Sequence, residues 1–170
     1  KEVWAEFAAA EVDIEGHTTL VVSVHMQSIG LDSDDKALYK ELTKGEGTDD
    51  LRAVRHQLLG KLGNAFRIRA RQARMLRQQI DSLGYENVLV CGDFNDTPIS
   101  YTHRTIAQDL DDAFTQSGRG LGISYNQNRF YFRIDNILTS KNLRAYNCTV
   151  DRSIKESDHY PIWCYITKRY

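Results

Sequence analysis

The stretch Val88-Leu89-Val90-Cys91-Gly92-Asp93-Phe94-Asn95 decides the fold. Its first four residues are all apolar and lie between Glu86-Asn87 and Gly92, a pattern typical of a short strand that is buried on both faces. Asp93 and Asn95 follow directly, so we expect their side chains at the carboxyl end of this strand, where open α/β sheets place their ligands. Two polar residues that are two apart on an extended backbone point the same way, so both can reach one ligand. Taken alone, the segment fits a turn capped by Asp and Asn equally well.

Helical and extended patterns both precede this strand. Residues 4–12 and 18–25 predict two strands that are joined by a turn at Glu15-Gly16. From Leu51 to Leu83 the apolar residues recur at helical intervals, which predicts a helix that Gly60 and Gly63 could kink or divide. Gly84 is the expected stop signal of this helix.

The elements after the strand complete the fold prediction. A helix is expected from Ser100 to Leu110, followed by strands over residues 134–138 and 160–166. The order strand, helix, strand, helix, strands predicts an α/β protein that is built on mixed sheets.

Length and composition predict one compact domain over residues 1–170. The chain has 170 residues, of which 41% are hydrophobic, enough for a real core. Its longest apolar runs are far shorter than the roughly 20 residues that span a bilayer, so no membrane contact is indicated. Neither a signal peptide nor a targeting motif is recognised in these residues, and the compartment stays open. The cysteines Cys91, Cys148 and Cys164 form no metal-binding or disulfide pattern, so we expect buried free thiols.

The net charge of -1 conceals a local asymmetry. Residues 32–50 are rich in acids and predict an exposed insertion. Arg52–Gln79 contains many basic residues and no acidic one. This basic helix is either an edge that faces phosphate or an ordinary solvated surface.

Four further polar residues lie in or beside apolar runs. Asp158 and His159 stand just ahead of the final strand, a hard metal ligand beside a proton-carrying imidazole. Asp135 lies within an apolar run, where an acid needs a partner, and orienting a histidine is the natural use. His25 ends its own apolar strand, a place where a lone histidine is more often structural.

Four motifs together, in this order, resemble the endonuclease/exonuclease/phosphatase superfamily, the fold of DNase I and the abasic-site endonucleases. They are His25 at a strand end, Gly92-Asp93-Phe94-Asn95, Ile134-Asp135-Asn136-Ile137 and Ser157-Asp158-His159-Tyr160-Pro161-Ile162. The resemblance implies a DNase I-like sandwich of mixed β-sheets flanked by helices. The chain matches the carboxyl-terminal two-thirds of such a domain, so the domain is expected to be truncated, with its amino-terminal strands absent from this chain. The family's upstream Asn and metal-binding Glu have no assigned counterpart here.

The resemblance implies a metal-assisted phosphoester hydrolase. Asp93 would be the base that activates the attacking water, and Asn95 would hold the scissile phosphate and fix Asp93. His25 would match the family's second histidine, on the opposite side of the phosphate.

The other two motifs supply the remaining implied roles. His159 would donate to a phosphate oxygen, and Asp135 would hold its other ring nitrogen. Asp158 would belong to the site of a divalent metal, Mg²⁺ or Mn²⁺, since such ions prefer oxygen ligands.

The motifs describe a reaction centre and leave the substrate open. A phosphodiesterase or nuclease is the first hypothesis, and the basic helix favours nucleic acid as a partner. A phosphomonoesterase or phospholipid phosphodiesterase of the same superfamily is the second, and a non-catalytic binding module or inactive fragment is the third. A sheet edge left exposed by the truncation would allow pairing with another chain.

Overall fold

The computed structural model describes residues 6–30, 51–127 and 131–169. The predicted acidic insertion over 32–50 lies outside the described residues. The strands are β1 (Glu6–Ile14), β2 (His17–His25), β3 (Val88–Asp93), β4 (Leu110–Asp112), β5 (Asp135–Ser140), β6 (Leu143–Val150) and β7 (Ile162–Lys168). The helices are α2 (Leu51–Leu83), α3 (Tyr101–Ile106) and α4 (Ala113–Ser117). Among the described residues no helix is long and apolar enough to cross a membrane.

Five of the strands form a mixed sheet in the order β1-β2-β3-β5-β4, and β6 pairs with β7 in a second sheet. Strands β2 and β3 are parallel, whereas β5 runs antiparallel to β3. The predicted hairpin at the amino-terminal end is present, and its turn residues Glu15 and Gly16 both have positive φ, 53° and 81°. The mixed α/β prediction is therefore confirmed.

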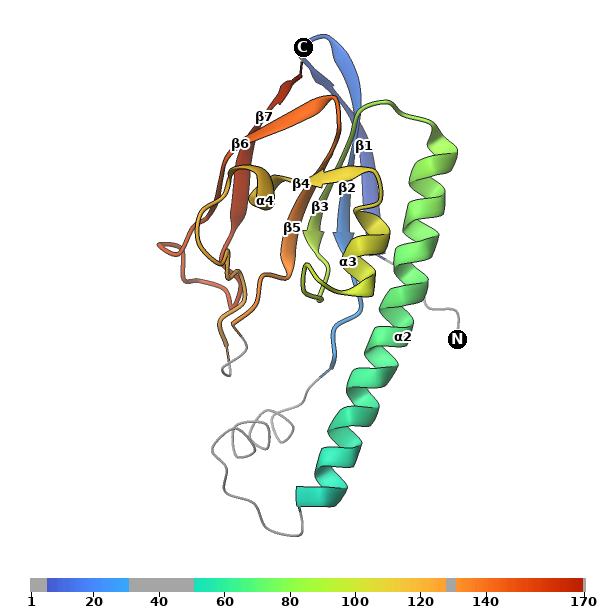
Figure 1. Cartoon of the computed structure of the whole chain (residues 1–170), viewed down its shortest axis with the longest axis vertical. Helices are drawn as coiled ribbons and strands as arrows, with labels where there is room; N and C mark the ends of the chain where they lie inside the picture. Colours follow the sequence, from blue (N-terminus) through green and yellow to red (C-terminus); the bar gives the residue numbers. More distant parts are fainter. Residues whose placement is uncertain (1–5, 31–50, 128–130, 170) are drawn as a thin grey trace.

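The large sheet is covered on both faces, as Figure 1 shows: α2 and α3 lie on one side, and α4 with the β6–β7 pair lies on the other. Strand β3 serves both cores. Val88 and Val90 face the core under α2, while Leu89 and Cys91 pack against the core under α4, β6 and β7. This two-sided burial explains the continuous apolar run that opens the β3 sequence.

Two helix predictions need correction. Helix α2 runs unbroken through Gly60 and Gly63, because burial of Leu58 and Ala65 on its inner face continues across the glycines and outweighs their low helix propensity. The helix capped by Ser100 ends at Ile106 and does not reach Leu110, which instead pairs with β5 as the start of β4.

Strand β6 was not predicted from the sequence. Its register against β7 shifts between Tyr146 and Thr149, and Asn147 has a positive φ of 51°. A bulge of this kind interrupts the alternation of side chains, which is the signal that marks a strand. The three cysteines are free thiols, as expected, but only Cys148 is fully buried; Cys91 and Cys164 are half-buried against the second core.

A buried ion pair joins the end of β4 to Arg133, just before the start of β5. Arg133 donates to both carboxylate oxygens of Asp112, at 2.9 and 2.6 Å, and the His103 ring nitrogen Nε2 lies 3.2 Å from Oδ2. The same carboxylate caps α4 by accepting from the backbone of Phe114. Burial alone would raise the pKa of Asp112, but the hydrogen bonds from His103 and Arg133 and the Arg133 charge hold it well below its usual value.

We expect Asp112 to make the protein sensitive to acid. Because its pKa is lower in the folded chain than in the unfolded chain, the stabilisation is complete above the unfolded pKa of about 4 and declines as the pH falls below it. Between about pH 5 and pH 3 the free energy of unfolding should therefore fall more steeply for the wild type than for Asp112→Asn. Urea unfolding at a series of pH values measures both slopes, and equal slopes would contradict this role.

Candidate active site

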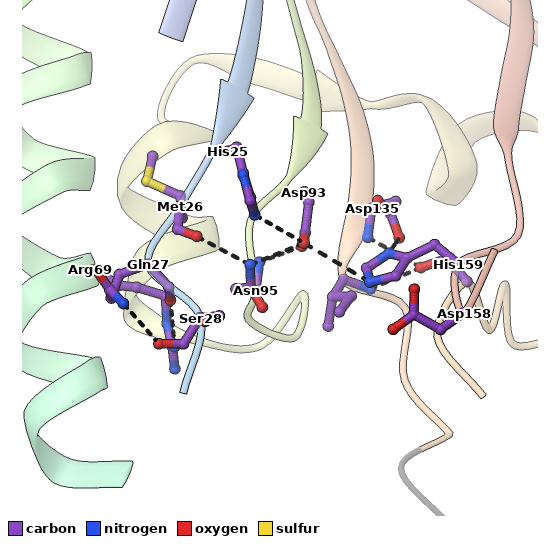
Figure 2. A network of polar contacts seen from close by, with 12 residues as sticks. His25, Met26, Gln27, Ser28, Arg69, Asp93, Asn95, Asp135, Asp158 and His159 are labelled. Carbon is purple, nitrogen blue, oxygen red and sulfur yellow. Dashed lines mark hydrogen bonds and ion pairs between the residues drawn. The ribbon is translucent and has the colours of Figure 1, made fainter. Parts of the chain in front are cut away.

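The pairing of three strands brings the predicted polar residues to one edge of the large sheet. His25 pairs with Asp93 across β2 and β3, and Asp93 pairs with Asp135 across β3 and β5. The first two residues end parallel strands, whereas Asp135 begins an antiparallel one, so all three side chains meet at the same edge. Figure 2 shows them there, with His159 alongside.

Asp93 lies at the centre of this group. Its Oδ2 is 3.8 Å from Nε2 of His25 and 4.0 Å from Nε2 of His159. Burial is the largest influence on this carboxyl group and raises its pKa; the nearby Asp135 charge adds to this, and the backbone hydrogen bond from Asn95 and the two histidines oppose it. A carboxylate with a raised pKa beside two imidazoles is a suitable proton acceptor.

Asn95 holds Asp93 in place through a turn. Its backbone N–H donates to Oδ1 of Asp93 at 2.7 Å, and its side-chain amide donates to Oδ2 at 2.9 Å and to the carbonyl of Met26 at 3.0 Å. The two side chains lie together, as expected, and their sharing of one ligand stays a prediction, but the extended backbone that we inferred for Asn95 is wrong. β3 ends at Asp93, and Asn95 has a left-handed φ of 49°, which Asn tolerates better than most residues.

Gly92 allows this arrangement. It has a φ of 137°, and a Cβ built on it would lie 2.0 Å from the carbonyl oxygen of Val24 in β2. Only a residue without a side chain fits this close approach of the two strands.

Asp135 orients His159, as the apolar sequence around Asp135 predicts. Nδ1 of His159 lies 2.8 Å from Oδ2 of Asp135, and this hydrogen bond raises the pKa of the histidine. The Tyr125 ring meets the imidazole edge-on, with ring centroids 5.0 Å apart. Ser124 Oγ accepts from the backbone N–H of Asp135 at 3.1 Å and so fixes the start of β5. Neither Ser124 nor Tyr125 was singled out in the sequence, where both belong to an irregular glycine-rich segment.

Asp158 is exposed and lies beside His159, on the rim of a cavity of about 580 Å³ that also exposes His25, Asp93 and Asn95 (Figure 2). All the predicted site residues except Asp135 line this cavity, and Asp135 holds His159 from behind it.

The group best placed for a cation differs from the sequence prediction of Asp158. Asp93, Asp135 and His159 each offer a ligand atom within 4.8 Å of the others. Burial is the main reason that the pKa of Asp93 is raised, and the nearby charge of Asp135 raises it further; a divalent cation would relieve the repulsion between the two carboxylates. The donor set therefore fits a divalent metal, and the role of Asp158 stays a prediction.

A buried arginine that the sequence did not distinguish supports the site. Arg69 on α2 is only 1% exposed; its Nε donates to Asp96 at 3.1 Å and its guanidinium to the carbonyl of Gln27 at 3.0 Å. Gln72, one turn further on, accepts from the Gln27 backbone. These contacts tie the segment after His25 to α2 (Figure 2), and the bond to Asp96 ties the loop after Asn95 to the same helix. For Arg69, the interpretation of the basic helix as a solvated face is wrong, because the side chain is buried.

The fold and this centre together define an α/β protein of mixed sheets flanked by helices, with an Asp–His cluster at one sheet edge. The sequence model of the Endonuclease/Exonuclease/phosphatase family matches residues 43–159, and the chain belongs to that family. Enzymes of this family hydrolyse phosphoesters and generally use divalent metals. No curated protein sequence matches the chain significantly.

Solved structures show the same fold at low sequence identity. The endonuclease/exonuclease/phosphatase from Bacteroides vulgatus has a TM-score of 0.62 and 17% sequence identity. The match covers 97% of this chain and 55% of the Bacteroides vulgatus chain. The human Nocturnin catalytic domain with bound sulfate has a TM-score of 0.61 and 17% sequence identity. The match covers 97% of this chain and 53% of the Nocturnin chain. The mannosyl-6-phosphatase of Bacteroides thetaiotaomicron has a TM-score of 0.58 and 18% sequence identity. The match covers 90% of this chain and 52% of the phosphatase chain. The chain thus spans about half the length of the structures it matches.

Proposed function

We propose that this chain carries the reaction centre of a divalent-metal-dependent phosphoester hydrolase, and that phosphodiesters are its substrates. The observation that carries the proposal is the placement of Asp93 with a histidine on either side, His25 at 3.8 Å and His159 at 4.0 Å. Such a group can accept a proton and stabilise an anionic phosphorus centre in the same cavity.

Each side chain has a task that follows from its contacts. Asp93, held by two hydrogen bonds from Asn95, takes the proton of the attacking water. His159, whose Nδ1 is engaged by Asp135, presents Nε2 to a phosphate oxygen and donates its proton there. His25 is more exposed and contacts the phosphate from the other side.

A divalent ion held by the carboxylates of Asp93 and Asp135, with Asp158 at the rim, would neutralise phosphate charge and would leave the Nε2 proton of His159 available to the phosphate. Without it, the two carboxylates would repel an anionic substrate. Removal of the metal by a chelator should therefore abolish turnover.

The first test is hydrolysis of bis(p-nitrophenyl) phosphate with Mg²⁺, with Mn²⁺ and with EDTA. It is made on this chain and on a longer protein that contains it. We expect p-nitrophenol release that requires metal and that falls about 100-fold in His159→Ala. His56→Ala is the matched control, because His56 is exposed on α2 and lies outside the cavity.

Two further arms separate the substrate classes. Faster release from p-nitrophenyl phosphate would favour a phosphomonoesterase. A rate on a DNA or RNA substrate that falls steeply with added salt would favour a nuclease. If neither protein hydrolyses any of these esters, the hydrolase proposal is overturned in favour of a binding module.

A further inference from the structure

Beyond the polar centre, much of the cavity wall is apolar. His25, Asp93, Asn95 and His159 occupy one side. The rest of the wall includes Ile29, Leu62, Phe66, Tyr125, Phe132 and Ile134. These residues come from the segment after β2, from α2 and from the chain before β5, so three separate parts of the fold contribute to one apolar wall.

Two phenyl rings on this wall are open to solvent. Phe66 on α2 is 49% exposed, and Phe132 ahead of β5 is 43% exposed. Exposed apolar residues are common one at a time, but two half-exposed phenyl rings in one cavity with a polar centre indicate a surface for a ligand.

Both positions are held by buried or hydrogen-bonded neighbours. The guanidinium of Arg69 lies 4.9 Å from the centroid of the Phe66 ring. Arg69 is buried and forms an ion pair with Asp96. The backbone of Phe132 pairs with that of Tyr125, with N–H···O distances of 3.0 and 3.2 Å. These contacts hold the backbone of Phe132 and one face of the Phe66 ring, which limits the entropy lost when a ligand packs on them.

We infer that the substrate is a phosphoester whose organic part is a planar aromatic group, which packs on the wall of Phe66 and Phe132 while its phosphate lies against Asp93 and His159. This inference rests on the proposed function, since it assigns the phosphate to that centre. Phenyl and phenol rings on the wall favour an aromatic partner over a plain hydrocarbon, because aromatic pairs gain an electrostatic contact beyond the burial of area. A cavity of about 580 Å³ is of the size that holds one small ligand.

Binding of phosphonates tests this without any turnover, because their carbon–phosphorus bond is not a substrate for hydrolysis. The dissociation constants of phenylphosphonate, n-hexylphosphonate and methylphosphonate are measured by calorimetry on the full chain with Mg²⁺. We expect phenylphosphonate to bind about tenfold more tightly than methylphosphonate, and more tightly than the hexyl compound.

Single substitutions locate the effect. Phe66→Ala and Phe132→Ala should each weaken phenylphosphonate about five- to tenfold and leave methylphosphonate unchanged. Phe7→Ala is the matched control, since Phe7 is 42% exposed but lies on β1 outside the cavity. It should change neither constant.

The outcomes separate this inference from the proposed function. Methylphosphonate can bind in a manner weakened by His159→Ala while phenylphosphonate binds no more tightly. In that case the phosphate site is supported and the assignment of an aromatic substrate group is wrong. Tighter binding of the hexyl compound would overturn the aromatic assignment in favour of an aliphatic group. Failure of all three phosphonates to bind would overturn both proposals.

Discussion

Replacing Asp93 by asparagine is expected to lower metal-dependent phosphoester hydrolysis by about 10³-fold. The change keeps the shape of the side chain but removes the group that can accept a proton at the centre of the cluster. It also replaces one carboxylate of the candidate metal group by a neutral amide. Steady-state rates with bis(p-nitrophenyl) phosphate at saturating Mg²⁺ measure the effect.

Asp109→Asn is the matched control for this prediction. Asp109 is exposed and has a φ of 61°, a conformation that Asn also tolerates, so the substitution should change neither the rate nor the stability. We expect the midpoint of urea unfolding to be the same for Asp93→Asn as for the wild type. The lower rate would then come from the lost proton acceptor and not from unfolding. A rate within threefold of the wild type would mean that another group acts as the base.

Replacing Arg69 by methionine should destabilise the protein by about 3–5 kcal/mol. Its partner Asp96 is only 8% exposed, so the substitution leaves a buried carboxylate without its cation. Asp96 keeps hydrogen bonds from Thr102 and from the Thr97 backbone, but these do not balance its charge. The carbonyl of Gln27 loses a donor as well. Urea unfolding measures the change in the free energy of unfolding.

Arg67→Met provides the comparison on the same helix. The Arg67 side chain is exposed, so its loss should change stability by no more than about 0.5 kcal/mol. Equal effects at the two positions would show that the buried pair contributes no more than helix propensity or surface charge.

The sequence by itself was enough to predict most of the fold and the members of the centre. The apolar run of β3 indicated a strand buried on both faces, and both faces are covered. The acid within an apolar run at Asp135 required a partner, and His159 supplies it. Such predictions succeed because burial and unpaired charge are costly wherever the chain places them.

The sequence could predict that distant residues form one site because four short motifs agreed with one family. No single motif located the centre; the turn after β3 alone was compatible with a simple cap. The order of the motifs indicated that His25, Asp93, Asp135 and His159 lie together. The strand register brings the first three to one edge, and a hydrogen bond to Asp135 adds His159.

Only the tertiary structure decided the details that arise from contacts between distant segments. Asn95 takes a left-handed turn because its amide reaches the carbonyl of Met26, a residue 69 positions earlier. Arg69 is buried because Asp96 and Gln27 lie next to α2, and a helical pattern of arginines does not distinguish it from the exposed Arg67.

The helix after Ser100 ends early because β5 offers Leu110 a strand partner. Local sequence predicts what a segment prefers and which side chains need burial or a partner. Which partner satisfies each need depends on the packing of layers that the local pattern does not contain.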